Sequence, residues 1–198
     1  MVVHADGTEA HPVSLPPRQA TCIRRRRDMK LETVHANLVK QPDVEALVNS
    51  ANANLRLGSG VAGAIHTAAG PRLEEYCKPF APLAYGAYLV TPGFKLPNPW
   101  VIHVRAASYN HHDDAPGVLR QALQAMLRAT HEHCIRSIAF PAIGTGVFAF
   151  PPVLAARITA EMLGQTSDIA PYLQLARLCV ADADLAEVYR SAFAVQAV

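Results

Sequence analysis

Short apolar runs alternate along the chain with segments whose apolar residues recur every three to four positions. The runs predict strands, and the periodic segments predict helices. Six strands are expected, at Leu31–Leu38, Val44–Val48, Ala87–Thr91, Val101–Ala106, Ser137–Phe140 and Leu173–Val180. Such alternation is typical of a mostly parallel sheet with helices on both faces.

Four helices are expected between and after these strands. The first has a stripe with i, i+3, i+4, i+7 spacing, formed by Val61, Ala64, Ile65 and Ala68. Three later segments carry similar stripes: Leu119, Leu123, Met126, Leu127 and Thr130; Leu154, Ile158 and Met162; and Leu185, Val188, Tyr189 and Phe193. A chain of 198 residues with 51% hydrophobic content is long enough for one domain with its own core.

Residues 1–28 differ from the rest of the chain, because they contain three prolines and show no sustained periodicity. We interpret them as a flexible N-terminal extension and place the domain at residues 29–198. No apolar run reaches the roughly 18 residues of a membrane helix, and the start lacks a secretion signal. The four cysteines are widely spaced, which favours reduced thiols. We therefore expect a cytoplasmic protein without a membrane partner, with a monomer as the default.

The formal charge of +2 lies outside the predicted domain, since residues 29–198 carry 13 basic and 13 acidic residues. General nucleic-acid binding depends on Lys and Arg that neutralise phosphates. A domain with no net charge therefore argues against a nucleic-acid partner, and the run Arg24–Arg27 is interpreted as a solvated charge cluster.

Two glycine-containing loops follow predicted strands, where ligands bind in open α/β sheets. The first, within Asn49–Ile65, has glycines at 58, 60 and 63 and leads directly into a helix. The second, Pro141–Pro151, has glycines at 144 and 146. Glycine permits close approach of a ligand, and a helix N-terminus favours an anion, so the pair predicts a site for a phosphorylated ligand. Phe148 in the second loop either offers its ring to a sugar or packs as a lid residue.

At these residues the chain resembles the macrodomain family. The stretches Leu47–Asn52, Gly58–Ile65 and Ala68–Pro71 look like the family's asparagine and glycine-loop signature, while Gly144–Phe148 and Val101–His103 resemble its second ligand loop and central strand. The resemblance runs from about Leu31 to Phe193. It implies a three-layer α/β/α fold with a mostly parallel central mixed sheet of about six strands, and ADP-ribose, or an ADP-ribosylated protein or metabolite, as the partner.

The resemblance also assigns ligand contacts residue by residue. Asn52 matches the asparagine that hydrogen-bonds the distal ribose, and Phe148 matches the aromatic residue beside that sugar. The diphosphate contacts are expected from two sets of loop residues: Gly58, Ser59, Gly60 and Val61, and Gly144, Thr145, Gly146 and Val147. Asn49 is expected to shape the turn, and Leu38 joins the predicted binding set. Asn52, Gly60 and Phe148 are the residues expected to support turnover.

Adenine recognition is predicted to be weakened at two positions. Asn37 falls where most relatives place an aspartate that accepts from the adenine amine, and an amide oxygen is a weaker acceptor. The aromatic residue that often stacks on adenine has no counterpart in Ala181–Ala183.

Catalysis is the open question, because Ala62 stands where many hydrolytic relatives carry an aspartate. A methyl group can neither accept a proton nor hold water. The pattern resembles a branch, including viral macrodomains, that hydrolyses without this acid, with the ligand's own phosphate positioning water. We therefore predict hydrolysis of ADP-ribosyl esters, on mono-ADP-ribosylated acidic residues or O-acetyl-ADP-ribose. The alternative is a non-catalytic reader of ADP-ribose or ADP-ribosylated proteins.

Two other candidate sites carry less weight. His111–Asp114 contains metal-ligand residue types, but adjacent residues rarely converge on one ion. His66, after the first loop, is interpreted as a packing residue rather than a general base. The proposed chemistry requires no cofactor and no metal.

Overall fold

A computed structural model describes residues 2–3, 9–10, 29–105 and 108–196. The predicted flexible extension lies largely outside the described residues. The described parts of it, β1 (Val2–Val3) and β2 (Glu9–Ala10), pair with each other, and β1 also pairs with the edge strand β5 (Tyr88–Pro92).

The six predicted strands are present. They are β3 (Lys30–His35), β4 (Ala46–Ala51), β5, β6 (Trp100–Arg105), β7 (Ser137–Pro141) and β8 (Leu175–Val180). The sheet order is β2-β1-β5-β6-β4-β7-β8-β3. The pairs from β6 to β3 are parallel, and β5 is antiparallel to β6. The predicted mostly parallel mixed sheet is confirmed.

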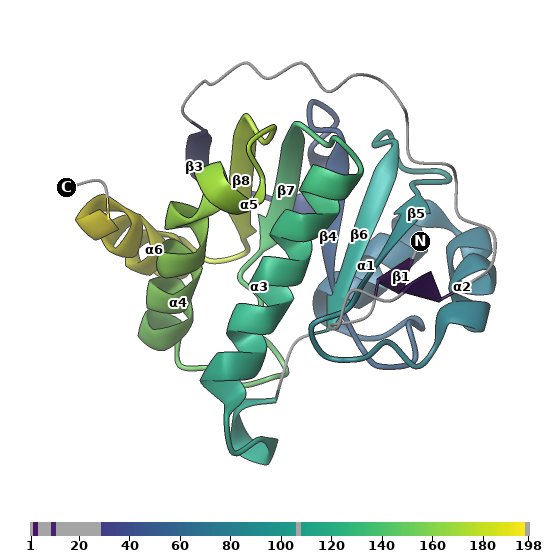
Figure 1. The fold of residues 1–198 in the computed structure, drawn as a ribbon, viewed down its shortest axis with the longest axis horizontal. Helices are drawn as coiled ribbons and strands as arrows, with labels where there is room; N and C mark the ends of the chain where they lie inside the picture. The colour runs from purple at the N-terminus through teal and green to yellow at the C-terminus, as the bar shows by residue number, and fades with distance from the viewer. Residues whose placement is uncertain (1, 4–8, 11–28, 106–107, 197–198) are drawn as a thin grey trace.

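Helices cover both faces of the sheet and give three layers (Figure 1). One face carries α1 (Gly60–Ala69) and α2 (Pro71–Cys77). The other carries α3 (Ala115–Glu132), α4 (Pro152–Gly164) and α6 (Ala183–Gln196), with the short α5 (Thr166–Ile169). Short 3-10 turns complete the fold: η1 (Leu38–Lys40), η2 (Lys78–Phe80) and η3 (Tyr109–His111).

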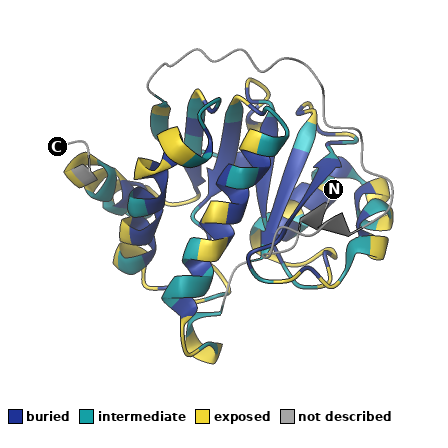
Figure 2. Ribbon diagram, in the orientation of Figure 1, coloured by how far each residue is buried: buried dark blue, intermediate teal, exposed yellow. Residues whose placement is uncertain are grey.

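Each helical layer has its own hydrophobic core. Along β4, Ala46 and Val48 face one cluster, while Leu47 and Ala51 face the other. This alternation follows from the two-residue period of a strand. The strands are consequently buried between the helices (Figure 2). Among the described residues, no helix combines the length and hydropathy that crossing a bilayer requires.

Two predicted details are wrong. The strand predicted to reach Leu38 ends at His35, because the Asn37 side chain accepts from Val39 N at 3.1 Å and begins η1. On α1, the buried stripe is Ala62, Ile65, His66 and Ala69, and Ala64 is exposed. Of the predicted stripe, Ile65 is buried and Val61 and Ala68 are partly buried against the same core, so the prediction fails at Ala64 and misses the buried histidine.

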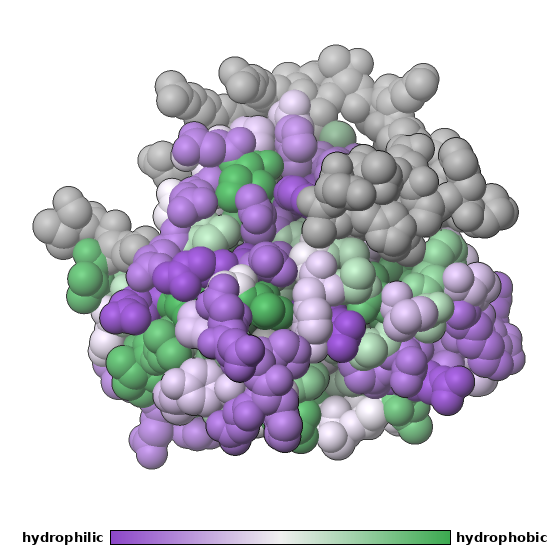
Figure 3. All heavy atoms as spheres, turned by 60° about the horizontal axis from the view of Figure 1, so that its bottom comes forward, coloured by the Kyte–Doolittle hydropathy of each residue, from purple (hydrophilic) through white to green (hydrophobic). Residues whose placement is uncertain are grey.

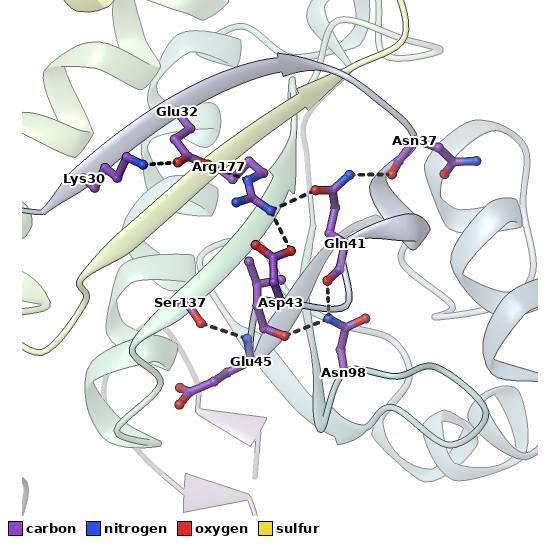
Figure 4. A network of polar contacts seen from close by, with 10 residues as sticks. Lys30, Glu32, Asn37, Gln41, Asp43, Glu45, Asn98, Ser137 and Arg177 are labelled. Atoms are coloured by element: carbon purple, nitrogen blue, oxygen red, sulfur yellow. Dashed lines mark hydrogen bonds and ion pairs between the residues drawn. The ribbon is translucent and has the colours of Figure 1, made fainter.

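A charged network ties the edge of the sheet to the segment before β4 (Figure 4). Arg177 on β8 lies 2.6 Å from Glu32 on β3 and 2.8 Å from Asp43, and it also donates to Gln41 Oε1 at 2.9 Å. The arginine side chain is only 14% exposed. Because buried charges require partners, the three elements are held together through one guanidinium.

Arg177→Met is expected to lower the free energy of unfolding by about 2 kcal/mol at pH 7, since hydrogen bonds to a charged group are lost. The pKa of Glu32 is lowered by hydrogen bonds from Lys30 and Arg177, and the pKa of Asp43 by its hydrogen bond to Arg177. Each lowered pKa stabilises the fold at pH values above the pKa of the unfolded state, which is 4.5 for Glu32 and 3.8 for Asp43. This contribution is lost as the pH falls through the pKa of the folded state.

Urea titrations at pH 7 and pH 3 test this prediction, with Arg190→Met as the control, because Arg190 pairs with Glu187 on an exposed helix surface. The destabilisation by Arg177→Met should shrink at pH 3. An equal loss at both pH values would contradict the ionic origin.

Candidate functional site

The two glycine loops meet at one edge of the sheet. β4 and β7 are parallel neighbours, so the loop from β4 to α1 and the loop from β7 to α4 leave the same edge. This edge lies at the bottom of Figure 1 and is turned forward in Figure 3, where polar and apolar side chains are interspersed. Ligands of open α/β sheets bind at this edge.

The Asn52 side chain organises the first loop. Its Nδ2 donates to Arg56 O at 2.8 Å, and its Oδ1 accepts from Arg56 N at 3.2 Å. Leu55, inside this turn, has a φ of 54° and is 1% exposed. The buried Leu55 side chain and the two hydrogen bonds between the Asn52 amide and Arg56 therefore fix the turn that begins at Asn52.

Close packing requires glycine where the loop meets α1. A Cβ at Gly63 would lie 2.4 Å from Gly58 O, and a Cβ at Gly58 would lie 3.3 Å from Asn52 Nδ2. The loop backbone thus rests against the helix. Gly60 differs, because its φ is 58° and a Cβ there would meet nothing within 4 Å. Gly60 consequently faces open space at the helix start.

The second loop is built in a comparable way. Gly144 has a φ of 91°, and a Cβ there would lie 2.8 Å from the Phe150 ring, which is buried. Thr145 Oγ1 donates to Ala142 O at 2.9 Å, so this hydroxyl is turned into the loop. Gly146 faces open space, and Val147 is 73% exposed.

Phe148 packs against the core, which agrees with one of the two interpretations that the sequence left open. It is half-buried against the core cluster, and its carbonyl oxygen accepts from Tyr109 N at 2.7 Å. This bond joins the second loop to η3, which follows β6. The residue is partly exposed, and a contact of its ring with a sugar stays a prediction.

Both loops present backbone N–H groups without a protein partner. Within the described residues, the N–H groups of Gly58, Ser59 and Gly60 donate to no protein acceptor, and the same holds for Gly146, Val147 and Phe148. Unpaired N–H groups at a helix N-terminus are a favourable environment for an anion. Two such sets on neighbouring strands suit a ligand with two phosphate groups.

Asn37 and Leu38 lie at the carboxyl end of β3, at the same edge. The Asn37 amide oxygen caps η1, and its backbone oxygen accepts from Gln41 Nε2 at 3.0 Å. Leu38 is 7% exposed, so its side chain belongs to the core. After β8, Asp182 Oδ1 accepts from Asp184 N and Leu185 N and caps α6. The turn after β8 is therefore a helix cap without an aromatic ring.

A buried polar chain lies beneath the first loop. Asn49 Nδ2 lies 3.0 Å from His103 Nδ1, and His103 Nε2 lies 3.1 Å from Thr91 Oγ1. Burial and, to a smaller extent, the neighbouring His66 together lower the pKa of His103 to about 3. This histidine is therefore neutral at pH 7. Asn49 is 1% exposed, so it supports the end of β4 from below rather than reaching the edge.

His66 also lies in this buried layer. It is 4% exposed, and neither ring nitrogen has a hydrogen-bond partner among the described residues. Burial lowers the pKa of His66, while the nearby Glu74 carboxylate opposes this shift. The interpretation of His66 as a packing residue fits its burial.

The loops contain few side chains that could transfer protons. Arg56 is the only charged residue in the segments 49–65 and 141–151. Ala62 is 6% exposed, and its methyl group would lie 3.7 Å from a Cβ at Gly58. The Ala62 methyl group thus lies buried on α1, close to Gly58.

The metal-ligand residue types predicted at His111–Asp114 include a helix cap. In the segment His111–Asp114, Asp114 Oδ1 caps α3 by accepting from Gly117 N at 2.9 Å.

An apolar groove of about 630 Å³ lies between α4 and α6, where Figure 3 shows apolar side chains at the left of the molecule. None of the predicted ligand-binding residues lines this groove.

Sequence reasoning missed the support given by Glu74. Its Oε2 accepts from Leu57 N at 2.9 Å, although 17 residues separate the two. The sequence held no signal for this contact, because α2 was not predicted.

Comparisons with known proteins cover both loops. A family model described as Macro domain matches residues 48–159. A Macro domain-containing protein of Lactiplantibacillus plantarum is 36% identical over 141 residues, which are 70% of this chain and 81% of the relative. The O-acetyl-ADP-ribose deacetylase of Salmonella gallinarum is 38% identical and covers 67% of this chain and 76% of its own. A mutant of the Oceanobacillus iheyensis macrodomain, solved with ADPR, has a TM-score of 0.79 at 28% identity and covers 86% of this chain and 95% of its own.

Proposed function

The chain belongs to the macrodomain family, and we propose that it binds ADP-ribose at the carboxyl edge of its sheet and hydrolyses ADP-ribosyl esters. The observation that supports this proposal is the pair of loops whose backbone N–H groups have no partner among the described residues. The substrates are mono-ADP-ribosylated acidic side chains or O-acetyl-ADP-ribose. The deacetylase of Salmonella gallinarum, a relative at 38% identity, supports this substrate class.

The diphosphate is placed between the two loops. It is contacted from the first loop and the start of α1 by Gly58, Ser59, Gly60 and Val61, and from the second loop by Gly144, Thr145, Gly146 and Val147. Because these contacts are made by backbone groups and a helix N-terminus, they require no metal. The distal ribose then lies between Asn52 and Phe148, and the adenine lies toward Asn37 and Leu38.

Hydrolysis must proceed without an acidic side chain from the loops. For a carboxylate linked to C1″ of the distal ribose, water attacks C1″, the C1″–O bond to the carboxylate breaks, and the water proton passes through a phosphate oxygen to the departing carboxylate. For an acetyl group on another ribose hydroxyl, water attacks the acetyl carbonyl carbon instead, and its proton passes to the departing ribose oxygen. Asn52 holds the ribose, and the loop fixes the diphosphate beside it, so the protein contributes orientation. The absence of acids from both loops favours this ligand-assisted route.

A titration of the full chain with ADP-ribose in a calorimeter tests binding. Release of ADP-ribose from a glutamate-modified peptide tests hydrolysis. Saturable binding followed by release supports the proposal, and a full chain that binds no ADP-ribose would refute it.

A non-catalytic reader is the second candidate function, and Ala62 is the observation that favours it. This methyl group is buried and can neither accept a proton nor hold a water molecule. A protein that binds ADP-ribose with no release from the modified peptide would be a reader.

Asn37→Asp is expected to strengthen ADP-ribose binding by about fivefold, because a carboxylate is a stronger acceptor for the adenine amine. Aspartate can still cap Val39 N, so η1 should persist. Comparing dissociation constants for ADP-ribose and for ribose 5-phosphate isolates the adenine contribution. An unchanged affinity for ADP-ribose would place the adenine away from Asn37.

A further inference from the structure

We infer that Glu74 is a positioning residue for the first diphosphate loop, a role that rests on the proposed function. Glu74 lies on α2, which follows α1 directly after Gly70. Its carboxylate reaches back to the loop and accepts from Leu57 N at 2.9 Å. Leu57 immediately precedes Gly58, the first residue of the proposed diphosphate contact.

The middle of this loop depends on the Glu74 contact. Its first half is closed by the paired bonds between Asn52 and Arg56, and its second half by Gly63 N donating to Ser59 O at 3.4 Å. Between them, the Leu57 side chain is 58% exposed and supplies little packing. The carboxylate of Glu74 therefore holds the backbone at the point where side-chain burial does not.

This contact orders the backbone without using the groups that the ligand needs. Glu74 accepts from the N–H of Leu57, while the next three N–H groups have no partner in the part of the chain that the structure describes. A loop that is already ordered loses less conformational entropy when a ligand binds. Glu74 thus raises affinity although its own charge is unfavourable near a diphosphate.

The histidine beside Glu74 leaves its carboxylate free to accept from Leu57 N. Glu74 Oε2 lies 4.0 Å from His66 Nδ1, and the His66 side chain is 2% exposed. His103, the other titratable group beside His66, has its ring centroid 6.4 Å away. A neutral His66 does not form an ion pair with the carboxylate, so Glu74 remains available to Leu57 N.

Three variants of the full chain test the inference by calorimetric titration with ADP-ribose. Glu74→Ala is expected to weaken binding on the order of tenfold, because a charge-assisted hydrogen bond is lost. Glu74→Gln keeps an oxygen acceptor for Leu57 N and should remain within about threefold of the wild type. Glu75→Ala removes the same charge from an exposed neighbour that forms no hydrogen bond with another described residue through its side chain, and should bind as the wild type does.

Amide hydrogen exchange separates positioning from general stability. In Glu74→Ala, exchange should accelerate at Leu57 and the following loop residues and stay unchanged in β4 and α2. Acceleration throughout α2 would overturn the inference, as would wild-type affinity in Glu74→Ala or equal weakening in the Gln or Glu75 variants. If the wild type itself bound no ADP-ribose, the proposed function would fail instead, which is a distinguishable result.

Discussion

Gly60→Glu is expected to abolish ADP-ribose binding while the protein remains folded. The added side chain points into open space, since no atom lies within 4 Å of its Cβ position. The glutamate must adopt the left-handed backbone φ of 58°, which costs about 1–2 kcal/mol for a non-glycine residue. The new carboxylate stands beside the unpaired N–H groups of the loop, where it competes with and repels a diphosphate. We expect affinity to fall by about 100-fold or more.

Calorimetric titration with ADP-ribose and thermal unfolding together measure this effect. Ala64→Glu is the matched control, because Ala64 is exposed on the same helix and the substitution adds the same charge. The control should retain most of the affinity. Equal weakening in both variants would indicate a long-range charge effect and would contradict a diphosphate site at Gly60.

The large features of the fold could be predicted from hydrophobic patterns. The buried stripe of α3 contains all five predicted residues, because this long helix has a clear apolar side and a polar side. α2 was missed because its seven residues hold only two buried positions, Leu73 and Cys77, which is too short a pattern to detect. Periodicity therefore identified the elements that bury much surface and failed for those that bury little.

The part of the candidate site that is formed by the backbone of the two glycine loops could be predicted from the sequence. Glycines before a helix are visible in the sequence, and the structure places both glycine loops at one edge of the sheet. The contacts beneath the loop were not predictable, because Glu74 and Leu57, or Asn49 and His103, become neighbours only after the helices and strands pack. Long-range side-chain contacts leave no local pattern.

Asn52→Ala is expected to reduce release of ADP-ribose from a glutamate-modified peptide by about 100-fold, the usual effect of removing one well-placed donor in a catalytic site. The substitution removes the proposed ribose contact and both bonds to Arg56. Because the backbone N–H groups of the two loops remain, ADP-ribose affinity should fall less than turnover does.

Asn54→Ala is the matched control, since Asn54 lies in the same loop, is exposed, and its side chain makes no hydrogen bond within residues 29–105 and 108–196. Single-turnover rates at saturating enzyme separate the chemical step from binding. Release that persists in Asn52→Ala would show that this loop does not perform the reaction. A wild type that binds ADP-ribose and releases none would make Ala62 the decisive residue, because the loops then retain every proposed ligand contact and lack only a group that holds water.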